Sequence, residues 1–155
     1  MDVRIKKIEP MRVAFVRHVG PYHDVGQTWA KLTTWAGPKG LLGPGSTLVG
    51  IPLDDPDITP PERVRYDACL VVDGSVMPEG EVGIQETSGG ECAVAVHNGP
   101  PAEIGETFAR LYGEWLPASG RELRSSPNLI IVRNWLPSMT PETMSPEVYV
   151  PLKSS

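Results

Sequence analysis

The stretch from Met11 to Ala36, MRVAFVRHVGPYHDVGQTWAKLTTWA, decides the fold, because a second version of it runs from Glu91 to Trp115. A shift of 79 positions aligns the two versions without a gap. It pairs Ala14 with Ala93, His18 with His97, Gly20 with Gly99, Pro21 with Pro100, Thr28 with Thr107 and Leu32 with Leu111. Two copies are too few for a stacked repeat protein. The pattern therefore predicts one domain made of two halves related by a pseudo-twofold axis.

Each copy predicts a strand followed by a helix. In residues 13–18, alternate side chains are expected to point to opposite faces of a strand, and the two faces lie in different surroundings. In the HisXGlyPro turn, glycine adopts backbone angles closed to other residues and proline suits the first turn of a helix. The helix then shows an apolar stripe at helical spacing, and Gly37-Pro38 ends it. The stripe consists of Val25, Trp29, Leu32 and Ala36.

The remaining segments extend the same order of elements. A second helix is expected from Ile104 to Trp115, ended by Pro117. Strands are expected at 3–8, 47–53, 64–72, 82–84, 92–96, 129–133 and 148–152. Each half is thus strand, strand, helix, strand, strand, which predicts an α+β fold with two helices packed on an antiparallel sheet. We expect residues 1–155 to form a single domain, with repeat one at about 2–73 and repeat two at about 81–152.

Composition narrows the classes of partner. The chain has 155 residues and a net charge of −5, and its basic residues are scattered, which disfavours direct nucleic-acid binding. It shows neither an apolar run of 18 residues nor a secretion leader, so we expect a cytoplasmic protein without membrane contact. Cys69 and Cys92 lie in predicted strands without CxxC spacing, which predicts reduced, buried thiols.

The sequence gives little support for a metal site or a cofactor site. His18 and His97 occupy the same repeat position, but no third ligand stands at metal-binding spacing, so both are expected to hydrogen-bond turn backbone. The acidic run at residues 54–57 lacks the glycine and the final glutamate of a calcium loop. No GxSxG, GxxxxGK[ST] or GxGxxG motif is present. We therefore expect no metal, no nucleotide cofactor and no hydrolytic triad.

Aromatic residues are the better candidates for a binding site. Trp29 and Phe108 lie on the helical stripes and are predicted to be core. Four other aromatic residues lie outside the clearest helical stripes or at strand edges. Such positions are typical of the walls of a flat, apolar pocket. These are Trp35, Tyr66, Tyr112 and Trp135.

Four segments in combination resemble the GyrI-like small-molecule-binding family. They are VAFVRHVGPY at 13–22, GIPLDDPDITPPERVRYDACLVV at 50–72, GGECAVAVHNGP at 89–100 and LYGEWLPASG at 111–120. The family includes stand-alone gyrase-inhibitor-like proteins and the effector-binding domains of AraC-type and MerR-type regulators. The resemblance implies a curved antiparallel sheet, two helices and a central hydrophobic groove between the repeats, at the pseudo-twofold axis. That groove accepts planar, often cationic or lipophilic compounds.

The chain departs from the family at the groove. Members commonly carry a buried Glu in a pattern like Pro-x-Phe/Leu-Glu-x-Tyr-x-Asn-Asp-Pro, and the matching segment here is PNLIIVRNWL at 127–136. Ile130 stands at the Glu position, Val132 at the Tyr position and Trp135 in place of Asp. Isoleucine neither activates water nor offsets a buried cation, so the resemblance implies a preference for neutral ligands. The candidate ligand-binding residues are Trp35, Tyr66, Tyr112, Trp115, Ile130, Val132 and Trp135.

Three functions follow from these observations. The favoured one is binding or sequestration of a planar, hydrophobic drug-like or toxin-like molecule. The second is a hydrolase of the cyclopropanoid kind, which would need a carboxylate from Glu106, Glu114 or Asp67. The third is a protein-interaction role with a gyrase-like partner or a regulator.

Overall fold

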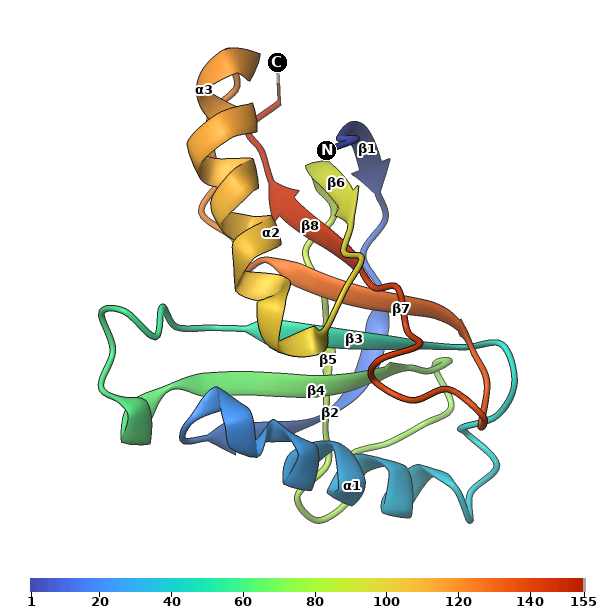
Figure 1. Cartoon of the computed structure of the whole chain (residues 1–155). Helices are drawn as coiled ribbons and strands as arrows, with labels where there is room; N and C mark the ends of the chain where they lie inside the picture. The colour runs from blue at the N-terminus through green and yellow to red at the C-terminus, as the bar shows by residue number, and fades with distance from the viewer. Residues whose placement is uncertain (155) are drawn as a thin grey trace.

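The computed structural model describes residues 1–154 and confirms the predicted α+β class. One sheet of eight antiparallel strands carries helices on one face (Figure 1). The strands are β1 (Arg4–Ile8), β2 (Arg12–Val19), β3 (Ser46–Pro52), β4 (Arg65–Val71), β5 (Gly83–Glu86), β6 (Gly90–Val96), β7 (Leu129–Trp135) and β8 (Glu147–Pro151). The helices are α1 (Val25–Ala36), α2 (Ile104–Arg110), the π-helical η4 (Leu111–Trp115) and α3 (Leu116–Ser119). Single 3₁₀ turns form η1 (Tyr22–Asp24), η2 (Pro61–Arg63) and η3 (Pro101–Glu103).

The strand order is β1-β6-β8-β7-β3-β4-β2-β5. Each strand of the first half (β1–β4) has a counterpart in the second half (β5–β8). When every strand is replaced by its counterpart, the same order is obtained in reverse, which is the result expected for a twofold axis between β3 and β7. The outer strands are exchanged between the halves, because β1 pairs with β6 and β5 pairs with β2. The registers agree as well: Ile5 faces Ala93, and their counterparts Ile84 and Ala14 face each other. Each half therefore completes the sheet of the other.

The helices cover two separate parts of one sheet face. Helix α1 packs on β2 and β4 through Leu32 and Ala36 (Figure 1). The second helix, which is formed by α2, η4 and α3 in succession, packs on β6 and β8 through Leu111. We call these contacts the first-half cluster and the second-half cluster. Side chains of the opposite face pack on one another within the curved sheet and form the inner cluster. Its buried members are Val13, Val49, Ile51, Cys69, Cys92, Val94, Leu129, Ile131 and Tyr149.

Each predicted HisXGlyPro turn is fixed by the same pair of hydrogen bonds. The ring of His18 lies 2.9 Å from Thr28 Oγ1 through Nδ1 and 2.9 Å from the carbonyl of Pro21 through Nε2. His97 bonds Thr107 at 2.7 Å and the carbonyl of Pro100 at 2.9 Å in the same way. A neutral ring donates one bond and accepts the other, so each buried histidine is satisfied. The histidines tie the end of a strand to the helix that follows.

The second helix differs from its expected course. It continues past Pro117 to Ser119 and ends at Gly120, whose φ is +72°. In the π-helical turn η4 the amide of Leu116 bonds the carbonyl of Leu111, five residues back. Pro117 then falls in the first turn of α3, where its missing N–H is tolerated.

Two further expectations can be compared with the structure. Cys69 and Cys92 are both free and buried, as predicted. No helix within residues 1–154 is long and apolar enough to cross a membrane.

Candidate functional site

The two halves meet along the pairing of β3 with β7, on the sheet face that carries the helices. Gly50 faces Ile130 in this pairing, and Leu48 faces Val132. Ile130 and Val132 are only half-buried, although β7 lies in the middle of the sheet. Their neighbours on the inner face, Leu129 and Ile131, are almost completely buried. We call this strip of β3 and β7 the seam, and its helix-side face is incompletely covered.

Tyr66 reaches from β4 across the seam. A Cβ atom placed on Gly50 would lie 2.0 Å from the Tyr66 hydroxyl, so glycine is the residue that lets the phenol lie over β3. The ring packs edge-on against Tyr22 and Trp29, with centroid separations of 5.9 and 6.3 Å. Burial raises the pKa of the Tyr66 phenol, with a smaller opposing effect from a hydrogen bond with Trp29. The phenol is thus neutral and presents one polar atom beside the seam.

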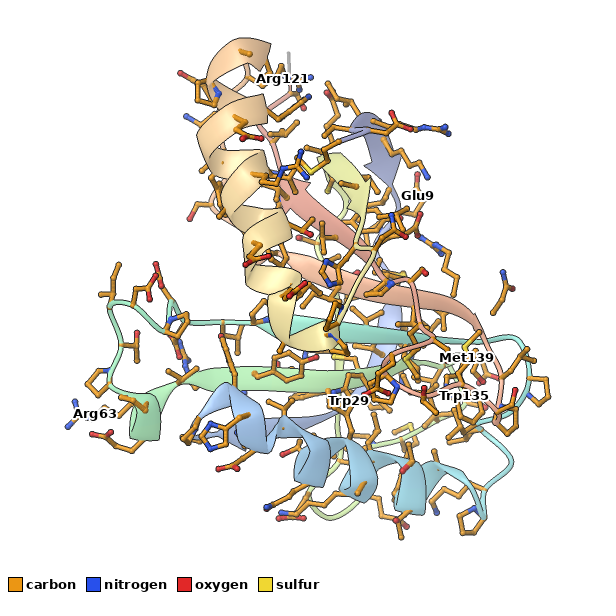
Figure 2. All side chains as sticks on the ribbon, in the orientation of Figure 1. Glu9, Trp29, Arg63, Arg121, Trp135 and Met139 are labelled. Atoms are coloured by element: carbon orange, nitrogen blue, oxygen red, sulfur yellow. The ribbon has the colours of Figure 1, made fainter. Side chains whose placement is uncertain are left out.

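Val132 and Trp135 bring the second half into contact with the first. Both side chains pack against the first-half cluster, although β7 belongs to the second half. Figure 2 labels Trp135 on β7 and Trp29 on α1. The Trp135 carbonyl accepts a hydrogen bond of 2.8 Å from Gly45, which fixes the end of β7 against the start of β3. Tyr66, Val132 and Trp135 are therefore members of one apolar cluster.

Of the remaining expected residues, Trp35 also packs against this cluster, whereas Tyr112 and Trp115 are not among its members. Tyr112 is 36% exposed, and its hydroxyl accepts a hydrogen bond from Asn128, just before β7. Burial also raises the pKa of the Tyr112 phenol. Trp115 packs into the second-half cluster beneath its own helix. Trp35 packs against the first-half cluster, and its indole donates a 2.7 Å hydrogen bond to Glu79 in the segment that links the halves.

Comparison with known proteins agrees with this architecture. The family model for the GyrI-like small molecule binding domain matches residues 1–153. The chain belongs to the GyrI-like family.

Two curated relatives and one solved structure are similar to this chain. The protein named Probable transcriptional regulator YgiV of Escherichia coli (strain K12) is 33% identical over 98% of this chain and 96% of its own length. The DNA gyrase inhibitor of the same strain is 29% identical over 82% of each chain. The crystal structure of the EcmrR C-terminal domain superposes with a TM-score of 0.72 at 17% identity, covering 99% of this chain and 98% of that one. This last likeness concerns the fold alone.

Of the three carboxylates considered for a hydrolase, one lies on β4 and the other two lie on α2 and η4. Asp67 is 1% exposed and points to the other face, where Arg17 holds both its oxygens at 2.8 and 3.0 Å. A further hydrogen bond of 2.9 Å comes from Gln85. Glu106 is exposed on α2, and Glu114 pairs with Arg110 at 3.3 Å on the helix surface. Within residues 1–154 no group of three His, Cys, Asp or Glu side chains is arranged to hold a metal ion.

Three residues that surround Tyr66 were not among the predicted ligand-binding residues. Tyr22 and Trp29 contact Tyr66 directly, and Gly50 makes room for it. Gly50 offered a signal, because a glycine within a strand often marks the close approach of another group. Trp29 lies on the helical stripe, and periodicity alone does not distinguish a core residue from one that borders a site.

Proposed function

We propose that this GyrI-like domain binds a flat, apolar and uncharged small molecule over the seam, between α1 and α2. One observation carries the proposal: Ile130 and Val132 stay half-buried at the centre of an eight-stranded sheet, whereas Leu129 and Ile131 on the opposite face are almost completely buried. Apolar side chains left partly open to solvent between two helices are typical of ligand sites. The family model supports small-molecule binding as the general role.

The chemistry of the surrounding side chains supports a neutral ligand. Ile130 and Val132 are aliphatic, and Tyr66, Trp29 and Trp135 add flat rings with few polar atoms. A cation held there would lose hydration without a carboxylate to offset the loss, which costs several kcal/mol. Tyr66 supplies a hydroxyl that can give or accept one hydrogen bond and thereby orient the ligand.

Sequestration is the biochemical role that this site serves. Asp67 is neutralised by Arg17, and Glu106 and Glu114 are exposed on the second helix, so the three candidate carboxylates favour binding over hydrolysis. A domain that binds without reacting either lowers the free concentration of its ligand or changes its affinity for a partner protein.

Titration of planar dyes, followed by tryptophan fluorescence, tests the proposal. We expect a neutral dye to change the fluorescence in a saturable manner, because Trp29 and Trp135 adjoin the seam. The substitution Val132→Trp should fill the space over the seam and weaken dye binding at least tenfold. Val19→Trp places the same ring at a position on β2 that is 60% exposed and should leave the affinity unchanged. A flat response to every dye at high micromolar concentration would overturn the proposal.

A further inference from the structure

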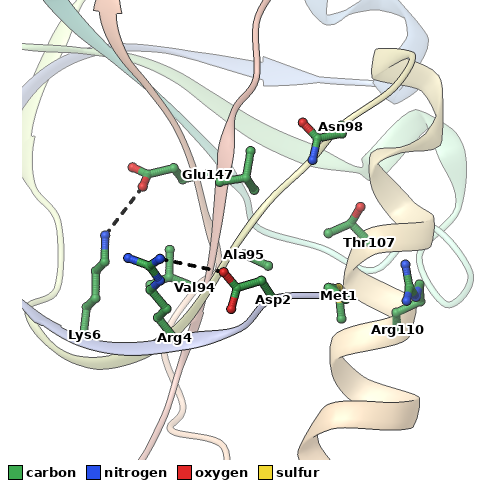
Figure 3. A pocket seen from close by; sticks show the side chains of 11 residues that line it. Met1, Asp2, Arg4, Lys6, Val94, Ala95, Asn98, Thr107, Arg110 and Glu147 are labelled. Carbon is green, nitrogen blue, oxygen red and sulfur yellow. Dashed lines mark ion pairs between the residues drawn. The ribbon is translucent and has the colours of Figure 1, made fainter.

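A hollow lies outside the seam, between the edge strand β1, the neighbouring β6 and helix α2. Its volume is about 480 Å³, within the range of small-molecule sites. Figure 3 shows that its basic side chains come from β1 and α2. The residues on which the argument depends are Arg4, Lys6, Val94, Val96, Arg110 and Glu147.

Two cations in this hollow are incompletely paired. Lys6 Nζ lies 3.7 Å from Glu147, beyond hydrogen-bond distance. Lys6 faces Oε2 of that carboxylate, whereas Arg133 at 2.9 Å and the Tyr149 hydroxyl at 3.1 Å both bond to Oε1. Arg4 lies 3.8 Å from Asp2, and both side chains are largely exposed. A chain of net charge −5 thus concentrates positive charge at this position.

The pseudo-twofold axis provides an internal comparison. The counterparts of Arg4 and Lys6, 79 positions later, are Gly83 and Gln85 of β5. A shallower hollow on α1 includes Lys31 and Glu81, the counterparts of Arg110 and Asp2, and their charged groups lie 3.7 Å apart. The first-half hollow therefore lacks both extra cations. The positive charge is a property of one hollow and not of the shared architecture.

Apolar surface adjoins the charges. Val96 and Met1 line the hollow and are 46% and 48% exposed. Val94 and Ala95 form the adjacent wall along β6. Exposed apolar side chains beside incompletely paired cations suit a ligand that has both an anionic and an apolar part.

We propose that this hollow binds a small amphipathic anion, with a carboxylate or phosphate head at Arg4 and Lys6 and a short apolar chain along Val96. The site is separate from the seam and independent of the function proposed for it. Because Arg4 and Lys6 are well exposed, the attraction is screened by salt, and millimolar affinity that falls with ionic strength is expected.

Amide NMR of the whole protein tests this site with hexanoate and hexyl phosphate as probes. Both should produce saturable shifts at residues 94–98 and 107–110, and the tighter of the two identifies the preferred head. Hexanol has the same chain without the charge and should bind at least tenfold more weakly. Absence of shifts at about 20 mM of either anion, or equal binding of hexanol, would overturn the proposal.

Matched variants separate this hollow from general electrostatics. The double substitution Arg4→Gln and Lys6→Gln should weaken anion binding at least tenfold, whereas Lys6→Arg should retain it. Lys31→Gln removes one positive charge from the first-half hollow and should change nothing. An unchanged amide spectrum away from β1 verifies that each variant is folded. Equal weakening by Lys31→Gln and the double variant would contradict a specific site.

Discussion

At the scale of single residues, the contact between Gly50 and Tyr66 is the most demanding feature of the seam. We predict that Gly50→Ala destabilises the protein by about 1–3 kcal/mol, because the new methyl group and the Tyr66 hydroxyl cannot occupy the same space. Urea unfolding measures this difference. Gly26→Ala is the matched control, since no atom lies within 4 Å of the added Cβ on α1.

The control variant Gly26→Ala should leave the free energy of unfolding unchanged or raise it by up to about 1 kcal/mol, because alanine favours the helix. Gly50→Ala should also weaken dye binding, since Tyr66 must move away from the seam. Equal stability of the two variants would show that the phenol does not lie over β3.

The buried phenol of Tyr66 predicts a dependence of stability on alkaline pH. Burial raises its pKa in the folded protein above the unfolded value of about 10. Above that pH the unfolded chain releases a proton that the folded protein retains, so the free energy of unfolding falls as pH rises. Tyr66→Phe should reduce this loss, as measured by urea unfolding at pH values from 8 to about 11. An identical pH profile for both proteins would contradict the buried position.

At the scale of elements, the histidine turns were predictable and the aromatic positions were not. His18 and His97 sit in a local motif, so spacing alone indicated that they bond turn backbone. The orientation of the Trp35 side chain depends on Glu79, which is 44 residues away. The orientation of the Tyr66 side chain depends on Gly50 in another strand. Such contacts between distant segments leave no periodic trace in the sequence. The π-helical turn before Pro117 was likewise hidden, because proline commonly ends a helix.

The two histidine turns predict equal effects of equivalent substitutions. Thr28→Val and Thr107→Val each remove the hydroxyl that bonds a buried imidazole. Each should lower the free energy of unfolding by about 1–3 kcal/mol, because one ring nitrogen is left without a partner. Thr34→Val, at an exposed position on α1, should change it by less than about 0.5 kcal/mol. Thermal or urea unfolding of the three variants makes the comparison, and a silent Thr107→Val would contradict the paired arrangement.

At the scale of the whole molecule, the exchange of outer strands makes the halves interdependent. Residues 1–79 and 80–155 expressed separately should remain largely unfolded, since each would lack the edge strand that the other supplies. Mixing them should restore strand signal in circular dichroism. Cooperative unfolding of either half alone would contradict this prediction.

Strand order and strand exchange were only partly predictable. The repeated sequence predicted two equivalent halves, but it did not show that β1 pairs across to β6. That pairing places β3 beside β7 and thereby positions Ile130 at the centre of the molecule. The candidate site is a consequence of topology, and its location follows from the pairing of the halves more than from any single motif.

The central claim is that an aliphatic seam selects neutral ligands, and Ile130→Glu tests it most directly. Dissociation constants for a neutral planar dye and its cationic analogue should be measured by tryptophan fluorescence, with Ile58→Glu in an 82% exposed loop position as the charge control. We expect the unmodified protein and Ile58→Glu to prefer the neutral dye, and Ile130→Glu to bind the cation at least tenfold more tightly than they do. Equal cation binding by Ile130→Glu and Ile58→Glu, or preference of the unmodified protein for the cation, would contradict the account.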